Sequence, residues 1–176
     1  EETLHRVRSR IGVLFQADAL FGSMSLAENV ALPLAEYTDL PPELIREIVR
    51  MKLGLVDLAG YDNHMPSELS GGMRKRAGLA RAMALDPTFL FYDEPWAGLD
   101  PVTAAELDIL IRSLNEGIGT TMVFVTQELA SIFSLGQRVI MLHKDVKGII
   151  ARGTPQELRE TSSDPRVNHF FNRQAG

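Results

Sequence analysis

Short apolar runs alternate with amphipathic segments along most of the chain. The apolar runs predict short strands, at residues 11–15, 89–94, 121–125, 138–143 and 149–151. Apolar positions that recur every three or four residues predict helices, at residues 26–36, 42–54, 101–115 and 128–135, with one more after Ser70 and two short ones after Thr154 and Asp164. Strands that alternate with helices favour an α/β fold with a mainly parallel sheet.

Local signals suggest where the helices begin and end. Ser25 with Glu28, and Thr154 with Glu157, have the spacing of capping boxes. A short helical piece is expected before Pro66, whereas residues 1–10 show no clear period. Glycines are expected to end two of the helices: Gly54 the helix at 42–54, and Gly117 with Gly119 the helix at 101–115.

Composition narrows the class of protein. The 176 residues are 45% hydrophobic and 23% charged, which is enough for one domain with a real core. The net charge of −5 argues against a nucleic-acid-binding surface, and the absence of cysteine excludes a disulfide framework. No apolar stretch approaches the roughly 18 residues that a membrane span needs, and no signal peptide is visible. We therefore expect a soluble protein that could dock on a membrane partner.

A glycine pair stands at the start of one predicted helix. Ser70, Gly71 and Gly72 precede the helical pattern, so the serine can cap the helix and the glycines leave its tip open. The unpaired N–H groups and the dipole of that tip favour an anion such as a phosphate. Taken alone, the motif is equally compatible with an ordinary glycine-rich turn.

The apolar run at residues 89–92 ends in two acids, Asp93 and Glu94. Ligands bind at the carboxyl ends of parallel strands, so both carboxylates are expected at a ligand edge. Asp93 is the candidate ligand of Mg²⁺, as the corresponding aspartate is in P-loop NTPases. Glu94 is the candidate acceptor of a proton from the attacking water.

With Pro95 to Pro101 added, the chain resembles the nucleotide-binding subunits of ABC transporters. The signature is residues 69–72, the Walker B strand is 89–94 and the D-loop is 98–100, in the family's order. The resemblance implies a P-loop NTPase-like α/β fold with an inserted helical subdomain. It would make 1–176 a partial domain: a helical subdomain at about 20–85, the remaining catalytic core at about 86–160, and short C-terminal helices at 155–176.

The resemblance also assigns roles to two glutamines. Gln16, after the first strand, would be the Q-loop residue that touches the metal and the attacking water. Gln127 would occupy the switch position, where the family usually has a histidine. Because glutamine cannot become positive, turnover is expected either to be slow or to depend more on Glu94 and Gln16; alternatively, glutamine substitutes adequately.

The phosphate-binding loop G-x-x-x-x-G-K-[ST] is absent from the sequence. The resemblance places it upstream of residue 1, so we expect the chain to lack the N-terminal portion of the domain. The 176 residues alone are then expected to be inactive and to bind ATP weakly. A degenerate binding module or an inert fragment is the alternative from a different class.

Partners follow from the resemblance. ATP and Mg²⁺ would bind between two subunits of a homodimer, with the signature and Asp100 of one subunit at the seam. A groove near Leu20, Phe21 and Met24 would receive the transmembrane permease, although such side chains are individually more typical of a core. The basic residues after the signature are interpreted as a solvated helix face without a catalytic role: Arg74, Lys75, Arg76 and Arg81.

Other segments are similar to the ATP-binding subunits of Mla/MCE-type lipid transporters: residues 19–24, Met73, residues 153–158 and residues 164–167. That similarity implies phospholipid transport between bacterial membranes, an MCE-type lipid-binding partner, and a cytoplasmic position on the inner face of the inner membrane. An importer of amino acids or other small solutes is the alternative.

Overall fold

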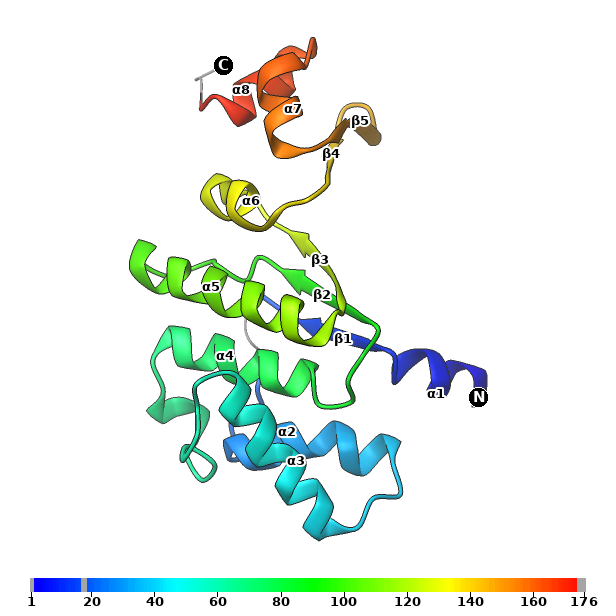
Figure 1. Cartoon of the computed structure of the whole chain (residues 1–176), viewed down its shortest axis with the longest axis vertical. Helices are drawn as coiled ribbons and strands as arrows, with labels where there is room; N and C mark the ends of the chain where they lie inside the picture. The colour runs from blue at the N-terminus through cyan, green and yellow to red at the C-terminus, as the bar shows by residue number, and fades with distance from the viewer. Residues whose placement is uncertain (1, 17–18, 174–176) are drawn as a thin grey trace. The chain divides into compact units, whose positions relative to one another are not determined.

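The computed structural model describes residues 2–16 and 19–173. The chain divides into two compact units, Glu1–Thr126 and Gln127–Gly176. Figure 1 traces the elements of each unit along the chain. The expected subdivision at about residues 85 and 86 stays a prediction. Within the C-terminal segment expected at residues 155–176, positions 174–176 lie outside the described residues.

A parallel sheet forms the centre of the first unit. Its strands are β1 (Ile11–Leu14), β2 (Phe89–Asp93) and β3 (Thr121–Val125), hydrogen-bonded in the order β1-β2-β3. Leu14 pairs with Tyr92, and Asp93 pairs with Val125. All three strands are where the apolar runs predict them, and the parallel arrangement of the predicted α/β fold is confirmed.

In the first unit some helices pack on this sheet and others pack on neighbouring helices (Figure 1). They are α1 (Glu2–Arg8), α2 (Leu26–Tyr37), α3 (Pro42–Leu55), the 3₁₀ turn η1 (Pro66–Glu68), α4 (Gly71–Ala82) and α5 (Pro101–Ile118). The central helix is α4, which contacts β1, α2, α3 and α5. The sequence did not reveal α1, because Leu4 and Val7 are the only apolar residues in this short helix and are too few to show a period.

The helix ends differ in detail from the prediction. The Ser25–Glu28 capping box is confirmed, with Glu28 N–H donating to Ser25 Oγ at 3.2 Å. Gly54 and Gly117 lie inside α3 and α5, so they do not end these helices. Of these three glycines, Gly119 is the one that ends its helix, because its left-handed φ of 70° lets its N–H reach the carbonyl of Asn115. The short helix expected before Pro66 is instead η1, which begins at that proline.

The two faces of the sheet are unequal. Leu14, Leu90 and Tyr92 are buried on the face that the helices cover. On the other face four apolar side chains are 40–61% exposed within the described part of the chain: Phe89, Phe91, Val123 and Val125. A continuous apolar run is typical of a strand that is buried on both faces, but among the described residues these strands are buried on one face only. An apolar run in the sequence shows which side chains are apolar. Which of them are buried depends on how the helices pack on the sheet.

The second unit has its own core. It contains α6 (Leu129–Leu135), β4 (Val139–His143), β5 (Gly148–Gly153), α7 (Pro155–Thr161) and α8 (Pro165–Phe171). β4 and β5 form an antiparallel hairpin. The core consists of buried side chains from three helices, Leu129, Leu158, Val167 and Phe171. The Thr154–Glu157 capping box is confirmed.

Candidate functional site

Three candidate residues lie at one edge of the sheet in the first unit. Because β1, β2 and β3 are parallel, their carboxyl ends meet at the same edge. Gln16 follows β1 by two residues, Asp93 is the last residue of β2, and Glu94 comes next. This is the edge at which open α/β sheets bind ligands.

Glu94 has an unusual backbone conformation. Its φ is 44°, in the left-handed region, which costs of order 1–3 kcal/mol for a residue other than glycine. Its N–H donates to the carbonyl of Val125 at 2.9 Å. Its Oε2 accepts a hydrogen bond from Thr126 Oγ1 at 3.3 Å. The end of β3 therefore holds both the main chain and the carboxylate of Glu94.

Thr126 is a residue that the sequence analysis left without a role. The available signal was its position directly after a strand parallel to β2. The position of Thr126 in the sequence predicts that it lies at this edge of the sheet, but it does not predict which side chain its hydroxyl contacts. The structure shows that this partner is Glu94 Oε2.

The glycine-led tip of α4 is solvent-accessible. Ser70 is exposed, and its Oγ accepts the N–H of Met73 at 3.2 Å, so it caps the helix as predicted. No acidic side chain stands in the first turn of α4. A capped tip without a carboxylate retains the positive end of the helix dipole.

The two glycines at this tip are in different environments. A Cβ built on Gly71 would meet Leu99 Cδ2 at an ordinary 3.8 Å. A Cβ built on Gly72 would lie 2.5 Å from Thr103 Cγ2, closer than non-bonded carbon atoms approach. Gly72 is therefore required by the close packing of α4 against the start of α5, whatever else binds at the tip.

Asp100 caps α5. Its Oδ1 accepts the N–H groups of Val102 at 3.0 Å and Thr103 at 3.1 Å, and its Oδ2 accepts Thr103 Oγ1 at 2.5 Å. The hydrogen bond from the Thr103 hydroxyl is the main cause that holds the pKa of Asp100 below its ordinary value. The carboxylate is therefore ionised, and both of its oxygens accept hydrogen bonds from the first turn of its own helix.

A buried tryptophan fixes the loop between β2 and α5. Trp96 is 6% exposed, and its Nε1 donates to Asp108 Oδ1 at 2.7 Å. Its ring lies 5.5 Å from that of Phe124 on β3. The loop that carries Gly98 and Asp100 is thereby attached to both α5 and β3.

The basic residues after the signature do not form a solvated face, so that interpretation is wrong. Lys75 is only 4% exposed, and its Nζ donates to the main-chain carbonyl of Gln16. Arg81 donates to the carbonyl of Ala19 at 2.6 Å, and Arg76 pairs with Asp57 at 2.6 Å. Charge pattern alone missed these contacts because each partner is distant in the sequence.

Gln127 is exposed and begins the second unit. Its role at the switch position stays a prediction.

The described residues contain no cluster of three or more His, Cys, Asp or Glu side chains that could hold a metal ion. Mg²⁺ does not need such a cluster, because it is commonly bound through one or two carboxylates together with substrate phosphates and water. The exposed carboxylate of Asp93 at the sheet edge fits this mode of binding.

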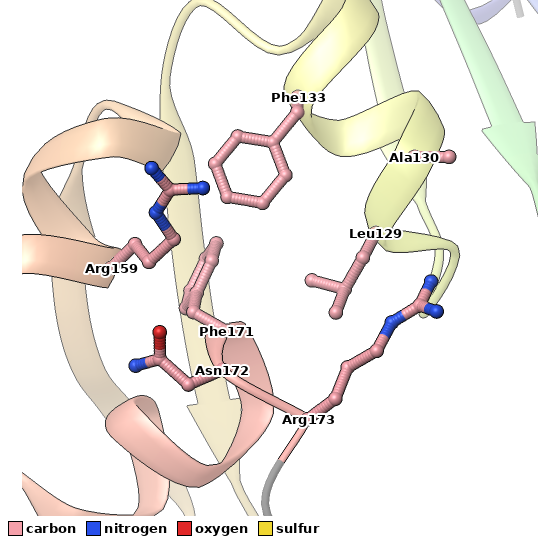
Figure 2. Close-up of a pocket in the computed structure, with 7 residues that line it drawn as sticks. All are labelled: Leu129, Ala130, Phe133, Arg159, Phe171, Asn172 and Arg173. Carbon is pink, nitrogen blue, oxygen red and sulfur yellow. The ribbon is translucent and has the colours of Figure 1, made fainter.

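An open pocket of about 400 Å³ lies within the second unit. Figure 2 shows Leu129, Phe133 and Phe171 as its apolar wall, with Arg159, Asn172 and Arg173 around it. The Arg159 guanidinium lies 5.2 Å from the centre of the Phe133 ring. None of the predicted site residues lines this pocket, so the sheet edge of the first unit is the better candidate site.

The family model for the ABC transporter matches residues 1–97, which is more than half of the chain. The chain belongs to the ABC transporter family. The matched part contains β1, the whole of α4 and the Asp93–Glu94 edge. The suspected resemblance is thereby confirmed.

Curated ABC relatives match almost the whole chain. The intermembrane phospholipid transport system ATP-binding protein MlaF of Escherichia coli (strain K12) is 45% identical over 168 residues, covering 96% of this chain and 61% of MlaF. MlaF of Haemophilus influenzae is also 45% identical, with 96% and 62% covered. The probable ribonucleotide transport ATP-binding protein mkl of Mycobacterium tuberculosis (strain H37Rv) is 46% identical, with 96% and 46% covered. The chain thus spans about half to three fifths of the length of these relatives.

A solved ABC structure has the same fold. The ATP-binding cassette MJ0796, as a dimer in a post-hydrolysis state bound to ADP and Pi, superposes with a TM-score of 0.75 at 32% identity. The match covers 88% of this chain and 67% of that one. The P-loop NTPase-like α/β fold is confirmed.

In the described part of this ABC chain, no helix is both long and apolar enough to cross a membrane.

Proposed function

We propose that this chain belongs to the ATP-binding and ATP-hydrolysing subunit of an ABC transporter. The observation that carries the proposal is the Asp93–Glu94 pair at the carboxyl edge of a parallel sheet, in a chain of this family. The left-handed backbone at Glu94 supports it, because strained positions cluster at functional sites.

Glu94 is the general base of the proposed reaction and accepts a proton from the water that attacks the γ-phosphate. The hydroxyl of Thr126 orients the carboxylate through the 3.3 Å hydrogen bond. Gln16, at the end of the neighbouring strand, orients the same water and contributes an oxygen to the metal. Gln127 offers the transferred phosphate a neutral hydrogen bond in place of the charged one that histidine would give.

Asp93 is the residue proposed to hold Mg²⁺. When bound, the ion neutralises charge on the phosphates during transfer. The remaining work of the protein is to position groups and to stabilise developing charge.

The proposed active form is a homodimer. Ser70, Gly71 and Gly72 present the tip of α4 to the phosphates of ATP on the partner subunit, and Asp100 lies at the seam beside them. The dimeric state of the similar cassette MJ0796 supports this assembly.

The proposed cargo is phospholipid, moved between bacterial membranes. The identity of 45% to MlaF over 96% of the chain supports it. The partners would be transmembrane permease subunits and an MCE-type lipid-binding subunit, with this subunit on the cytoplasmic face of the inner membrane. A small-solute importer is the alternative, and the name of the mycobacterial relative, ribonucleotide transport, favours keeping it. Lipid that copurifies with the full-length subunit and its permease would support the phospholipid proposal.

The decisive experiment measures ATP turnover by the full-length subunit with its permease. Glu94→Gln keeps the size of the side chain and removes the base, so we expect turnover to fall by about 10²–10⁴-fold while ATP still binds. Glu128→Gln is the matched control, since this glutamate caps α6. A Glu94→Gln subunit as active as the wild type, or an inactive wild type, would contradict the proposal.

The role of Gln127 needs its own variant. If it occupies the switch position, Gln127→His should raise turnover, because a charged hydrogen bond is roughly twice as strong as a neutral one. An unchanged rate would mean that glutamine serves equally well there.

A further inference from the structure

Lys75 is a buried cation with a specific main-chain partner. It lies in the second turn of α4, is 4% exposed, and donates through Nζ to the carbonyl of Gln16. Lysine is rarely buried without such a partner, because its ammonium group loses hydration. The contact joins residues 59 positions apart in the sequence.

Further contacts hold the loop residues that follow Gln16. Arg81, also on α4, donates to the carbonyl of Ala19 at 2.6 Å and lies 5.8 Å from the ring centre of Phe21. Asn29 on α2 is fully buried and exchanges hydrogen bonds with the main chain of Phe21, at 2.8 and 3.1 Å. The main chain at Gln16 and Ala19 is therefore attached to α4, and at Phe21 to α2.

The far end of α4 presses against the strand that leads to Gln16. A Cβ built on Gly12 of β1 would lie 2.2 Å from the carbonyl oxygen of Ala82, the last residue of α4. The helix therefore touches β1 at one end and the carbonyl of Gln16 through Lys75 nearer the other. A shift of α4 along or across the strand would disturb both contacts.

We propose that Lys75 is a positioning residue for ATP hydrolysis, and this proposal rests on the proposed function. Lys75 fixes the main chain of Gln16 to the helix whose tip is Ser70, Gly71 and Gly72. In the dimer, Gln16 serves the nucleotide of its own subunit, whereas the tip of α4 serves the nucleotide of the partner. Lys75 therefore makes Gln16 and the tip of α4 move together. In this way one helix of each subunit is connected to both bound nucleotides.

The experiment replaces the ammonium group and keeps the buried stem. Lys75→Met in the full-length subunit with its permease leaves the Gln16 carbonyl without this donor. We expect the kcat for ATP to fall about tenfold, as loss of a hydrogen bond from a charged group predicts, with KM for ATP changed by less than about threefold. Lys75→Arg keeps a charged donor and should recover most of the lost kcat.

Lys52→Met is the matched control. Lys52 is 1% exposed and pairs with Asp86, away from Gln16, so the same substitution removes a buried ammonium without touching the Q-loop residue. We expect its kcat to equal that of the wild type, even if its Tm falls more. A kcat for Lys75→Met equal to that of Lys52→Met, or an equal loss in Lys75→Arg, would overturn the proposal.

Amide hydrogen exchange gives a readout that does not depend on activity. Lys75→Met should speed amide exchange at Phe15 and Gln16, next to the lost contact, and leave α5 unchanged, whereas Lys52→Met should leave Phe15 and Gln16 unchanged. Unchanged exchange in Lys75→Met would overturn the proposed attachment. If the wild type does not hydrolyse ATP at all, the proposed function fails and the role in turnover fails with it, while faster exchange would show that the attachment itself exists.

Discussion

Two helices of the first unit, α4 and α5, begin with capped tips of different chemistry. Ser70 caps α4 through one neutral hydroxyl, which accepts a single N–H. Asp100 caps α5 through a carboxylate, which accepts two N–H groups and one hydroxyl. A full negative charge already compensates the dipole of α5, whereas the tip of α4 carries none. The comparison teaches that only one of the two tips is suited to a phosphate.

Within the comparison of the two caps, the largest expected effect comes from giving α4 the cap of α5. Ser70→Asp is as good a helix cap as serine, so the stability of the protein should not fall. The added carboxylate should repel the phosphates of ATP on the partner subunit and lower ATP turnover of the full-length transporter by at least about tenfold, because like charges brought together cost several kcal/mol. Ser70→Ala, which adds no charge, should have a smaller effect on turnover. Wild-type turnover in Ser70→Asp would mean that the tip faces no phosphate.

An intermediate effect tests the contact between the two tips. Gly72→Ala should destabilise the full-length protein by about 1–3 kcal/mol, as overpacking does, because its methyl group would meet Thr103 Cγ2. Thr103→Ser removes that methyl group and keeps the hydroxyl that donates to Asp100. The double variant should regain most of the loss in urea unfolding. A double variant as unstable as Gly72→Ala would contradict the packing explanation.

The smallest expected effect is a difference in pH dependence between the two caps. The folded-state pKa of Asp100 is lowered from 3.8, so its stabilisation is present above that value and is lost as the pH falls through the folded-state pKa. Asp100→Asn should therefore lower the free energy of unfolding slightly at about pH 6 and by a smaller amount at about pH 2. The loss in Ser70→Ala should be the same at both pH values, since a hydroxyl does not titrate there. Parallel pH profiles for the two variants would contradict this assignment.

The sequence was sufficient wherever the signal lies within a few residues. Capping boxes at Ser25 and Thr154, the helix start at Ser70 and the strand that ends at Asp93 were all predictable, because each depends on neighbours along the chain. Prediction was weakest where packing can override a local preference. Gly117 remains helical inside α5, because a glycine in a helix costs only about 1 kcal/mol.

The candidate site was predictable as a set of residues but not as a set of contacts. Parallel strands bring Gln16, Asp93 and Glu94 to one edge, which the order of the motifs already implied. The left-handed φ of Glu94 and its hydrogen bond from Thr126 depend on how the end of β2 meets the end of β3. No local sequence pattern predicts how the ends of these two strands come into contact.

The sequence by itself determined the family, the order of the strands and helices after residue 10, and the identity of the chemical groups at the sheet edge and the helix tip. Only the tertiary structure decided that Gly72 is required by Thr103, that Lys75 is buried against Gln16, and that one face of the sheet is covered and the other open. The physical reason is the separation along the chain over which each kind of interaction acts. Caps and periodic patterns act over one or two turns of chain, whereas burial and close approach depend on residues that meet only after the helices have packed.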